Sequence, residues 1–136
     1  MIDSKELRIG NKILRMGNVV TVSTIDDCRE EHYSSFLIGN YEDLASYSPK
    51  EYEPIPLTPE MLERCGFEEI YKSDFTIRFD YKLNGKIGAG WNLINGHFHV
   101  RYIGEKFTHV KQLHQLQNLY FALTGEELEI KELQQA

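Results

Sequence analysis

The stretch that decides the fold is THVKQLHQLQNLYFALTG, at residues 108–125. Apolar residues recur in it at spacings of three and four, which is the pattern of a helix with one apolar side. Thr108 can cap the first turn through its hydroxyl group, and Gly125 suits the left-handed residue that follows a last turn. The apolar side holds Val110, Leu113, Leu116, Leu119, Tyr120 and Leu123. We therefore predict a helix over 108–125 that covers the strands preceding it.

One polar residue, Gln117, falls on this apolar side. A buried amide group needs a hydrogen-bonding partner. Two interpretations are open: the side chain ties down the backbone of a nearby loop, or it lines a cleft for a ligand.

The length and composition fit one domain, or two very small units that share a core. The chain has 136 residues, of which 41% are hydrophobic and 12% aromatic. It contains no apolar run of about 18 residues and no apolar signal-peptide core near residue 1, so we expect neither a membrane span nor a secretory signal. Cys28 and Cys65 fit free thiols in a reducing compartment. These features predict a cytoplasmic protein.

The net charge of −6 is unevenly distributed along the chain. Residues 1–68 hold 13 Asp and Glu against 7 Lys and Arg, whereas residues 69–136 hold 8 of each. The acidic half fits either a solvated surface or one that meets a basic partner. The overall charge argues against strong non-specific DNA binding, but it leaves room for a local basic face.

The N-terminal half predicts a small antiparallel β unit over residues 1–57. Strands are expected at 12–15 and 19–25 around a turn at 16–18, with a third at 33–38. These short strands resemble a half-barrel of the Tudor or KOW kind, and residues 41–54 read as an irregular connection. After them, Thr58 and Pro59 are suited to begin a short helix that ends at Gly66.

A three-stranded meander is predicted next, with strands at 75–82, 87–94 and 98–102. The Asn-Gly pairs at 84–85 and 95–96 are typical hairpin turns. A three-residue loop at 83–85 pairs Phe79 with Ala89, and a two-residue turn at 95–96 pairs Trp91 with Val100. We expect helix 108–125 to lie on the apolar face of this sheet. That face holds Phe75, Ile77, Phe79, Tyr81, Ile87, Ala89, Trp91, Leu93, Phe98, Val100 and Tyr102.

The opposite face of the meander is the candidate binding surface. In the predicted register Gly90 lies between Arg78 and Arg101, which leaves open backbone between two forked donors that suit a phosphate or carboxylate. The predicted anion- or partner-binding residues are Arg78, Lys82, Gly90, Asn92, His97, His99 and Arg101. The alternatives are a solvated face whose glycines permit twist, and a face covered by a loop or a second copy.

The sequence offers little support for metal binding or catalysis. His97 and His99 have the spacing of two metal ligands on one strand, and Cys28 with His32 is half of a metal motif, but neither pair is completed. No nucleophile elbow, phosphate loop, Cys-x-x-Cys or His-Glu-x-x-His motif is present. We expect no metal, no cofactor and no catalytic residue, although an enzyme of unknown chemistry stays open.

Three stretches carry a resemblance to a known family: LRIGN (7–11), IPLTPEMLERCGF (55–67) and HQLQNLYFALTGEEL (114–128). Together they resemble a family of small uncharacterised proteins encoded by phages and integrated mobile elements of gut bacteria. The resemblance implies a phage-like origin and a bacterial cytoplasmic setting. It implies no activity, cofactor or site residue.

These observations predict an α+β protein made of a β unit over 1–57 and an α-β-β-β-α unit over 58–136 that shares its core. The favoured function is non-enzymatic binding through a protein partner. The second hypothesis is a nucleic-acid or anion binder that uses the basic face of the 75–102 sheet, and the third is a small enzyme.

Overall fold

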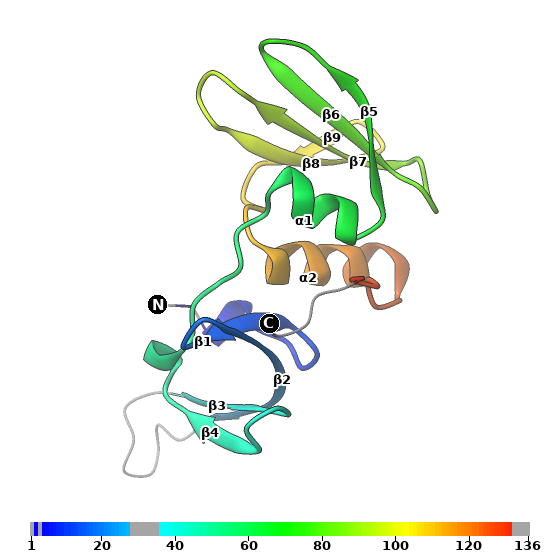
Figure 1. Cartoon of the computed structure of the whole chain (residues 1–136). Helices are drawn as coiled ribbons and strands as arrows, with labels where there is room; N and C mark the ends of the chain where they lie inside the picture. Colours follow the sequence, from blue (N-terminus) through cyan, green and yellow to red (C-terminus); the bar gives the residue numbers. More distant parts are fainter. Residues whose placement is uncertain (1, 3, 28–35, 132–136) are drawn as a thin grey trace. The chain divides into compact units, whose positions relative to one another are not determined.

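The computed structural model describes residues 2, 4–27 and 36–131 (Figure 1). Within this part the chain forms two antiparallel sheets and two α-helices, which confirms the predicted α+β class. It divides into two compact units. The described residues of 1–56 and 112–127 form the first unit, and those of 57–111 and 128–131 form the second. None of the described helices is long and apolar enough to cross a membrane.

The first unit contains a four-stranded antiparallel sheet in the order β1-β2-β3-β4. In Figure 1 the long strand β2 curves, and a bulge shifts its register against β3 between Val22 and Thr24. Beside β1, Leu14 forms a bridge with Glu53. The strands are β1 (Lys12–Arg15), β2 (Asn18–Asp27), β3 (Phe36–Asn40) and β4 (Ala45–Tyr47), with 3-10 helices η1 (Ser4–Glu6) and η2 (Pro49–Glu51). The predicted small antiparallel unit is thus present.

Two details of this unit differ from the prediction. The third strand runs from Phe36 to Asn40, two residues beyond the predicted end, and residues 33–35 lie outside the described residues. The stretch 41–54 is regular rather than irregular, because it holds a turn, β4 and η2. Short elements of this kind carry no periodic signal that a sequence pattern can show.

The core of the first unit lies inside the curved sheet. Tyr52 is fully buried, and its hydroxyl group donates to Ile38 O at 2.6 Å and accepts from Asn40 Nδ2 at 3.2 Å. These bonds satisfy the one polar atom of a large buried ring. The buried cluster consists of Ile2, Leu7, Ile13, Val20, Val22, Ile38 and Tyr52.

Helix α2 (Leu113–Thr124) is shorter than predicted and belongs to the first unit. Thr108 is not its N-cap; Gln112 is, and its N–H donates to Gln115 Oε1 at 3.1 Å. The helix starts late because Gln112 is extended and bridges to Pro56, and because Leu113 N donates to Ile55 O at 2.8 Å. The helix ends as predicted, at Gly125 in the left-handed conformation.

Gln117 fixes α2 to the strands and loops of the first unit. Its Oε1 accepts from Lys12 N at 2.8 Å, and its Nε2 donates to Gly10 O at 3.3 Å. The side chain therefore ties down loop backbone, which confirms the first interpretation of this residue and not the cleft. A buried amide with two backbone partners fixes the helix against the loop before β1.

Asn118 extends this contact to the LRIGN stretch. Its Nδ2 donates to Glu6 O at 2.6 Å, and its Oδ1 accepts from Asn11 Nδ2 at 2.9 Å and from Arg8 Nε at 3.2 Å. Arg8 also pairs with Glu127 through both terminal nitrogens. The stretches 7–11 and 114–128 thus contact each other through polar side chains.

The second unit contains helix α1 and a five-stranded meander in the order β5-β6-β7-β8-β9. Helix α1 (Pro59–Arg64) begins as predicted, since Thr58 Oγ1 accepts from Met61 N at 3.1 Å. It lies against one face of the sheet (Figure 1). The strands are β5 (Phe67–Lys72), β6 (Thr76–Tyr81), β7 (Ile87–Asn92), β8 (Phe98–Tyr102) and β9 (Glu105–Phe107). β5 and β9 were not predicted from the sequence.

The predicted register of the meander is confirmed between β6 and β7 and is wrong between β7 and β8. Phe79 pairs with Ala89, as predicted. Trp91, however, pairs with Phe98 and not with Val100. The β7–β8 connection is longer than a two-residue turn, because Asn92 Oδ1 accepts from the N–H groups of Ile94 and Asn95. A shift of two residues leaves every side chain on its predicted face.

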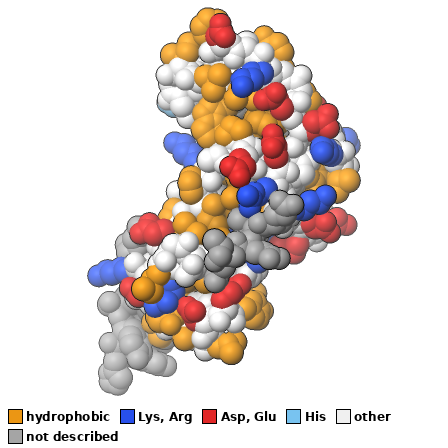
Figure 2. Space-filling view, in the orientation of Figure 1, with side chains coloured by type: hydrophobic (Ala, Val, Ile, Leu, Met, Phe, Trp, Pro, Cys, Tyr) orange, Lys and Arg blue, Asp and Glu red, His pale blue; other side chains and the backbone are white. Residues whose placement is uncertain are grey.

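The apolar face of the sheet is buried near α1 and open at its far end. Phe75 and Leu93 are 62% and 42% exposed, and Trp91 at the same end is half-buried. Figure 2 shows hydrophobic side chains gathered at this end. The predicted core residues that the structure buries are Ile77, Phe79, Tyr81, Ile87, Ala89, Phe98 and Val100.

Candidate functional sites

The outer face of the β5–β9 sheet holds the residues predicted to bind anions. Arg78, Gly90 and His99 lie in one row across β6, β7 and β8. The next row contains Gly88 and Arg101, and Arg101 pairs with Lys106 of β9. Asn92, the last residue of β7, lies at one end of this face, and its N–H donates to His97 O at 2.8 Å; Lys82 follows the last residue of β6 at the other end.

The glycine strip on this face is not open to a ligand, contrary to the prediction. A Cβ atom added at Gly90 would lie 2.5 Å from His99 Cε1, and one added at Gly88 would lie 2.6 Å from Arg101 Nη2. The His99 ring and the Arg101 guanidinium therefore cover the two glycines. The register shift explains the difference, because it brings His99 and not Arg101 opposite Gly90.

Arg101 is already engaged within the sheet. Its Nη2 donates to Phe79 O at 3.3 Å and lies 3.6 Å from Asp80 Oδ1. The pair of forked donors predicted from Arg78 and Arg101 is therefore reduced to Arg78. In the described part of the chain no ion pair engages the exposed side chains of Arg78, Lys82 and Lys106.

The positive charges of this face converge on His99. Burial lowers the pKa of His99, and the charges of Lys106, Arg101 and Arg78 lower it further. Lys106 was not among the predicted binding residues, because β9 was not predicted from the sequence. The signal was the Ile103-Gly104 pair, which forms a two-residue turn with φ of 49° and 81°.

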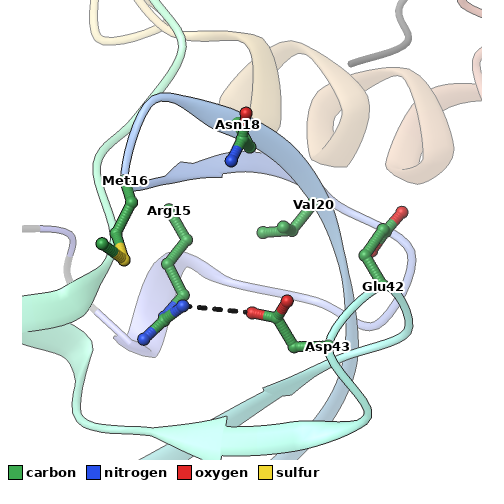
Figure 3. Close-up of a pocket in the computed structure, with 6 residues that line it drawn as sticks. All are labelled: Arg15, Met16, Asn18, Val20, Glu42 and Asp43. Carbon is green, nitrogen blue, oxygen red and sulfur yellow. Dashed lines mark hydrogen bonds and ion pairs between the residues drawn. The ribbon is translucent and has the colours of Figure 1, made fainter. Parts of the chain in front are cut away.

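The first unit has a pocket of about 370 Å³ that sequence analysis did not predict (Figure 3). It lies between the β1–β2 turn and the β3–β4 turn, and its lining residues are Arg15, Met16, Asn18, Val20, Glu42 and Asp43. In Figure 3 the Arg15 and Asp43 side chains point toward each other across it, and their closest atoms are 3.2 Å apart. This ion pair joins the two turns.

The charged residues of the pocket are held by several contacts. Arg15 also lies 3.4 Å from Glu51 Oε1, and its guanidinium carbon is 3.5 Å from the centre of the Tyr47 ring. Glu42 accepts from Thr21 N at 2.6 Å and from Thr21 Oγ1 at 3.0 Å. Glu42 and Asp43, two carboxylates of the acidic half of the chain, therefore fix the turn that borders the pocket.

The turns around the pocket present apolar side chains to solvent. Met16 and Leu44 are 81% and 87% exposed, and Tyr41 in the same turn as Leu44 is also exposed. Met16 and Leu44 have φ of 52° and 54°, in the left-handed region. Glycine and asparagine adopt this conformation at lower cost than methionine or leucine.

The thiol of Cys65 and the imidazole of His114 are both buried. Burial raises the pKa of the Cys65 thiol to about 12, so it is a small apolar residue of the core and a poor nucleophile. His114 has no exposed surface, and burial lowers its pKa against the opposing effect of Glu6.

Among the described residues no three His, Cys, Asp or Glu side chains are placed to hold a metal ion. His97 and His99 lie within this part of the chain, whereas Cys28 and His32 lie outside it. The His97–His99 pair is thus left without further His, Cys, Asp or Glu ligands in the part of the chain that the structure describes.

The comparisons with known proteins add no relative. The chain matches no family model, no curated protein and no solved structure. Its two candidate surfaces are therefore the outer face of the β5–β9 sheet and the pocket between the turns of the first unit, each defined by the geometry given above.

Proposed function

We propose that this chain is a non-enzymatic binding protein that acts through a protein partner. The turns around the pocket of the first unit, at residues 16–18 and 41–44, make the contact. The resemblance of the three sequence stretches supports a phage or mobile-element origin and a bacterial cytoplasmic setting, which form part of the same proposal.

The observation that carries the proposal is that two exposed apolar residues in left-handed backbone, Met16 and Leu44, lie on the two turns that border one pocket, whereas Ile103 lies in the β8–β9 turn of the second unit. A side chain with a Cβ atom costs roughly 1–2 kcal/mol in left-handed backbone. An exposed apolar side chain gains little from folding that would offset this cost. Backbone strain that the fold does not need is concentrated at functional positions. Contact with another protein would bury both side chains.

The surroundings of these two side chains suit a protein interface. Methionine, tyrosine and arginine are enriched in such interfaces, and Met16, Tyr41 and Arg15 lie on these turns or beside them. The carboxylates of Glu42 and Asp43 supply polar groups beside the apolar side chains. Their contacts with Thr21 and Arg15 hold them in place before any partner binds.

The experiment is capture of proteins from a lysate of a gut bacterium with the tagged chain, in nuclease and about 0.5 M salt. We expect a discrete protein to be retained by the natural chain and lost with Met16→Gly/Leu44→Gly. Glycine adopts the left-handed backbone without strain, so the variant keeps its fold while it loses both side chains.

Ile103→Gly is the matched control. Ile103 is also exposed, has φ of 49° and precedes a glycine, but it lies in the β8–β9 turn of the second unit. This variant should retain the same protein as the natural chain. Retention by Met16→Gly/Leu44→Gly at the natural level, or no discrete protein in any arm, would show that these turns are not the binding surface.

A further inference from the structure

The outer face of the β5–β9 sheet combines free positive charge with an exposed aromatic ring. Arg78, Lys82 and Lys106 are exposed, and within the described residues they form no ion pair. Two acids share the face: Asp80, which lies 3.6 Å from Arg101, and Glu68, which pairs with Asp80 across the strands. The side chains of this face that are available to a ligand therefore carry a net positive charge.

Tyr71 supplies the aromatic ring. It is 53% exposed and is the Cα partner of Arg78, so both side chains lie on the same face. The bulge between Glu69 and Tyr71 in β5 brings Tyr71 to this face. The guanidinium of Arg78, on the adjacent strand β6, adds a planar group beside the ring, whereas the imidazole of His99 lies in the same row three strands away, on β8.

We propose that this face binds single-stranded nucleic acid, with Arg78, Lys82 and Lys106 contacting phosphates and Tyr71 stacking on a base. An open basic surface with a planar aromatic group suits a single strand, whose unstacked bases can lie on the ring. Inorganic polyanions offer the same charges but no base. The net charge of −6 opposes long-range attraction, so binding is local and modest.

The test is fluorescence anisotropy with labelled oligo(dT) of about 12 nucleotides. Three phosphate contacts predict that a fourfold rise in salt, from about 50 mM, weakens binding about 20-fold. Arg78→Ala/Lys106→Ala leaves one contact, so the same rise should weaken its binding only about threefold. Lys72→Ala/Lys131→Ala removes the same charge from the second unit outside this face and should bind as the natural chain does.

Two competition experiments distinguish binding of single-stranded nucleic acid from general attraction between charges. Inorganic polyphosphate and a duplex of the same length should compete more weakly than the unlabelled single strand. Polyphosphate that competes equally well would reduce the effect to general attraction between charges and overturn the proposal. Absence of binding, or equal binding by natural chain and Arg78→Ala/Lys106→Ala, would overturn it as well.

His99 offers a readout inside the proposed site. Because nearby cations help to lower its pKa, a phosphate bound among them should raise that pKa. NMR titration of the His99 ring, assigned with His99→Gln, should show the rise when oligo(dT) is added. A bound strand that leaves the His99 titration unchanged lies elsewhere on the chain, which contradicts the proposal.

Discussion

Cys65 illustrates how burial decides the chemistry of a single residue. The side chain is 1% exposed, and desolvation raises the pKa of its thiol to about 12. In a Cys28→Ser variant, where Cys65 is the remaining thiol, we expect the reaction with a thiol reagent at about pH 8 to be roughly 1,000-fold slower than in denatured protein. Native and denatured rates within a factor of ten would show that the thiol is accessible.

The lowered pKa of His114 predicts that the first unit loses stability in mild acid. Burial lowers its folded-state pKa below the usual value of 6.5, so below that value the unfolded chain binds the proton more readily. Stability that is present at neutral pH is therefore lost as the pH falls through about 6.5 toward the folded pKa. Urea unfolding of the protein at several pH values between about 7.5 and 5.5 measures this loss.

Two variants isolate the contribution of His114. His114→Leu cannot gain a proton, so its free energy of unfolding should depend less on pH in this window. His99→Gln should keep the contribution of His114 while it removes that of the other histidine with a lowered pKa. An unchanged pH dependence in His114→Leu would assign the loss to other groups.

At the scale of elements, helix α2 is held by polar side chains in addition to its apolar face. Asn118 contacts Glu6 O, Asn11 and Arg8. Asn118→Ala removes these hydrogen bonds, and we expect it to lower the free energy of unfolding by about 2 kcal/mol. Glu126→Ala, in the exposed segment after the helix, should change it by less than about 0.5 kcal/mol. Similar small effects for both would mean that apolar packing alone holds α2.

A second prediction at this scale concerns the glycines of β7 that the His99 and Arg101 side chains cover. Gly90→Ala forces the His99 ring to move, because the new Cβ would lie 2.5 Å from it. We expect lower thermal stability and a displaced His99 ring resonance in NMR. Gly85→Ala meets no atom within 4 Å, so it should be neutral or slightly stabilising. If both variants behave alike, the His99 ring does not cover Gly90.

Elements with strong local signals were predicted well from the sequence. The Thr58-Pro59 start of α1, Gly125 at the end of α2 and the β6–β7 register all follow from local chemistry or alternation. β5 was missed because the acidic sequence FEEIYK has no apolar alternation and lies at the sheet edge. β9 was missed because its turn, Ile103-Gly104, places a β-branched residue where asparagine is usual.

At the scale of the whole molecule, periodicity predicted the apolar side of α2 but not the unit to which it belongs. The deciding contacts come from Gln117 and Asn118, whose partners lie more than 100 residues away in sequence. The candidate sites were predicted only in part, because some of their features also depend on residues far apart in sequence. Alternation placed Arg78 and His99 on one face, but the ring over Gly90 and the pocket of the first unit depend on long-range contacts.

The central claim is that the turns at 16–18 and 41–44 of the first unit contact a protein partner. The most direct measurement places a photo-reactive phenylalanine analogue at position 44, or at position 103 in a separate protein, and irradiates each in bacterial lysate. Crosslinking of one discrete protein from position 44, and not from position 103, is the predicted result. No crosslink from position 44, or the same set of products from both positions, would contradict the account.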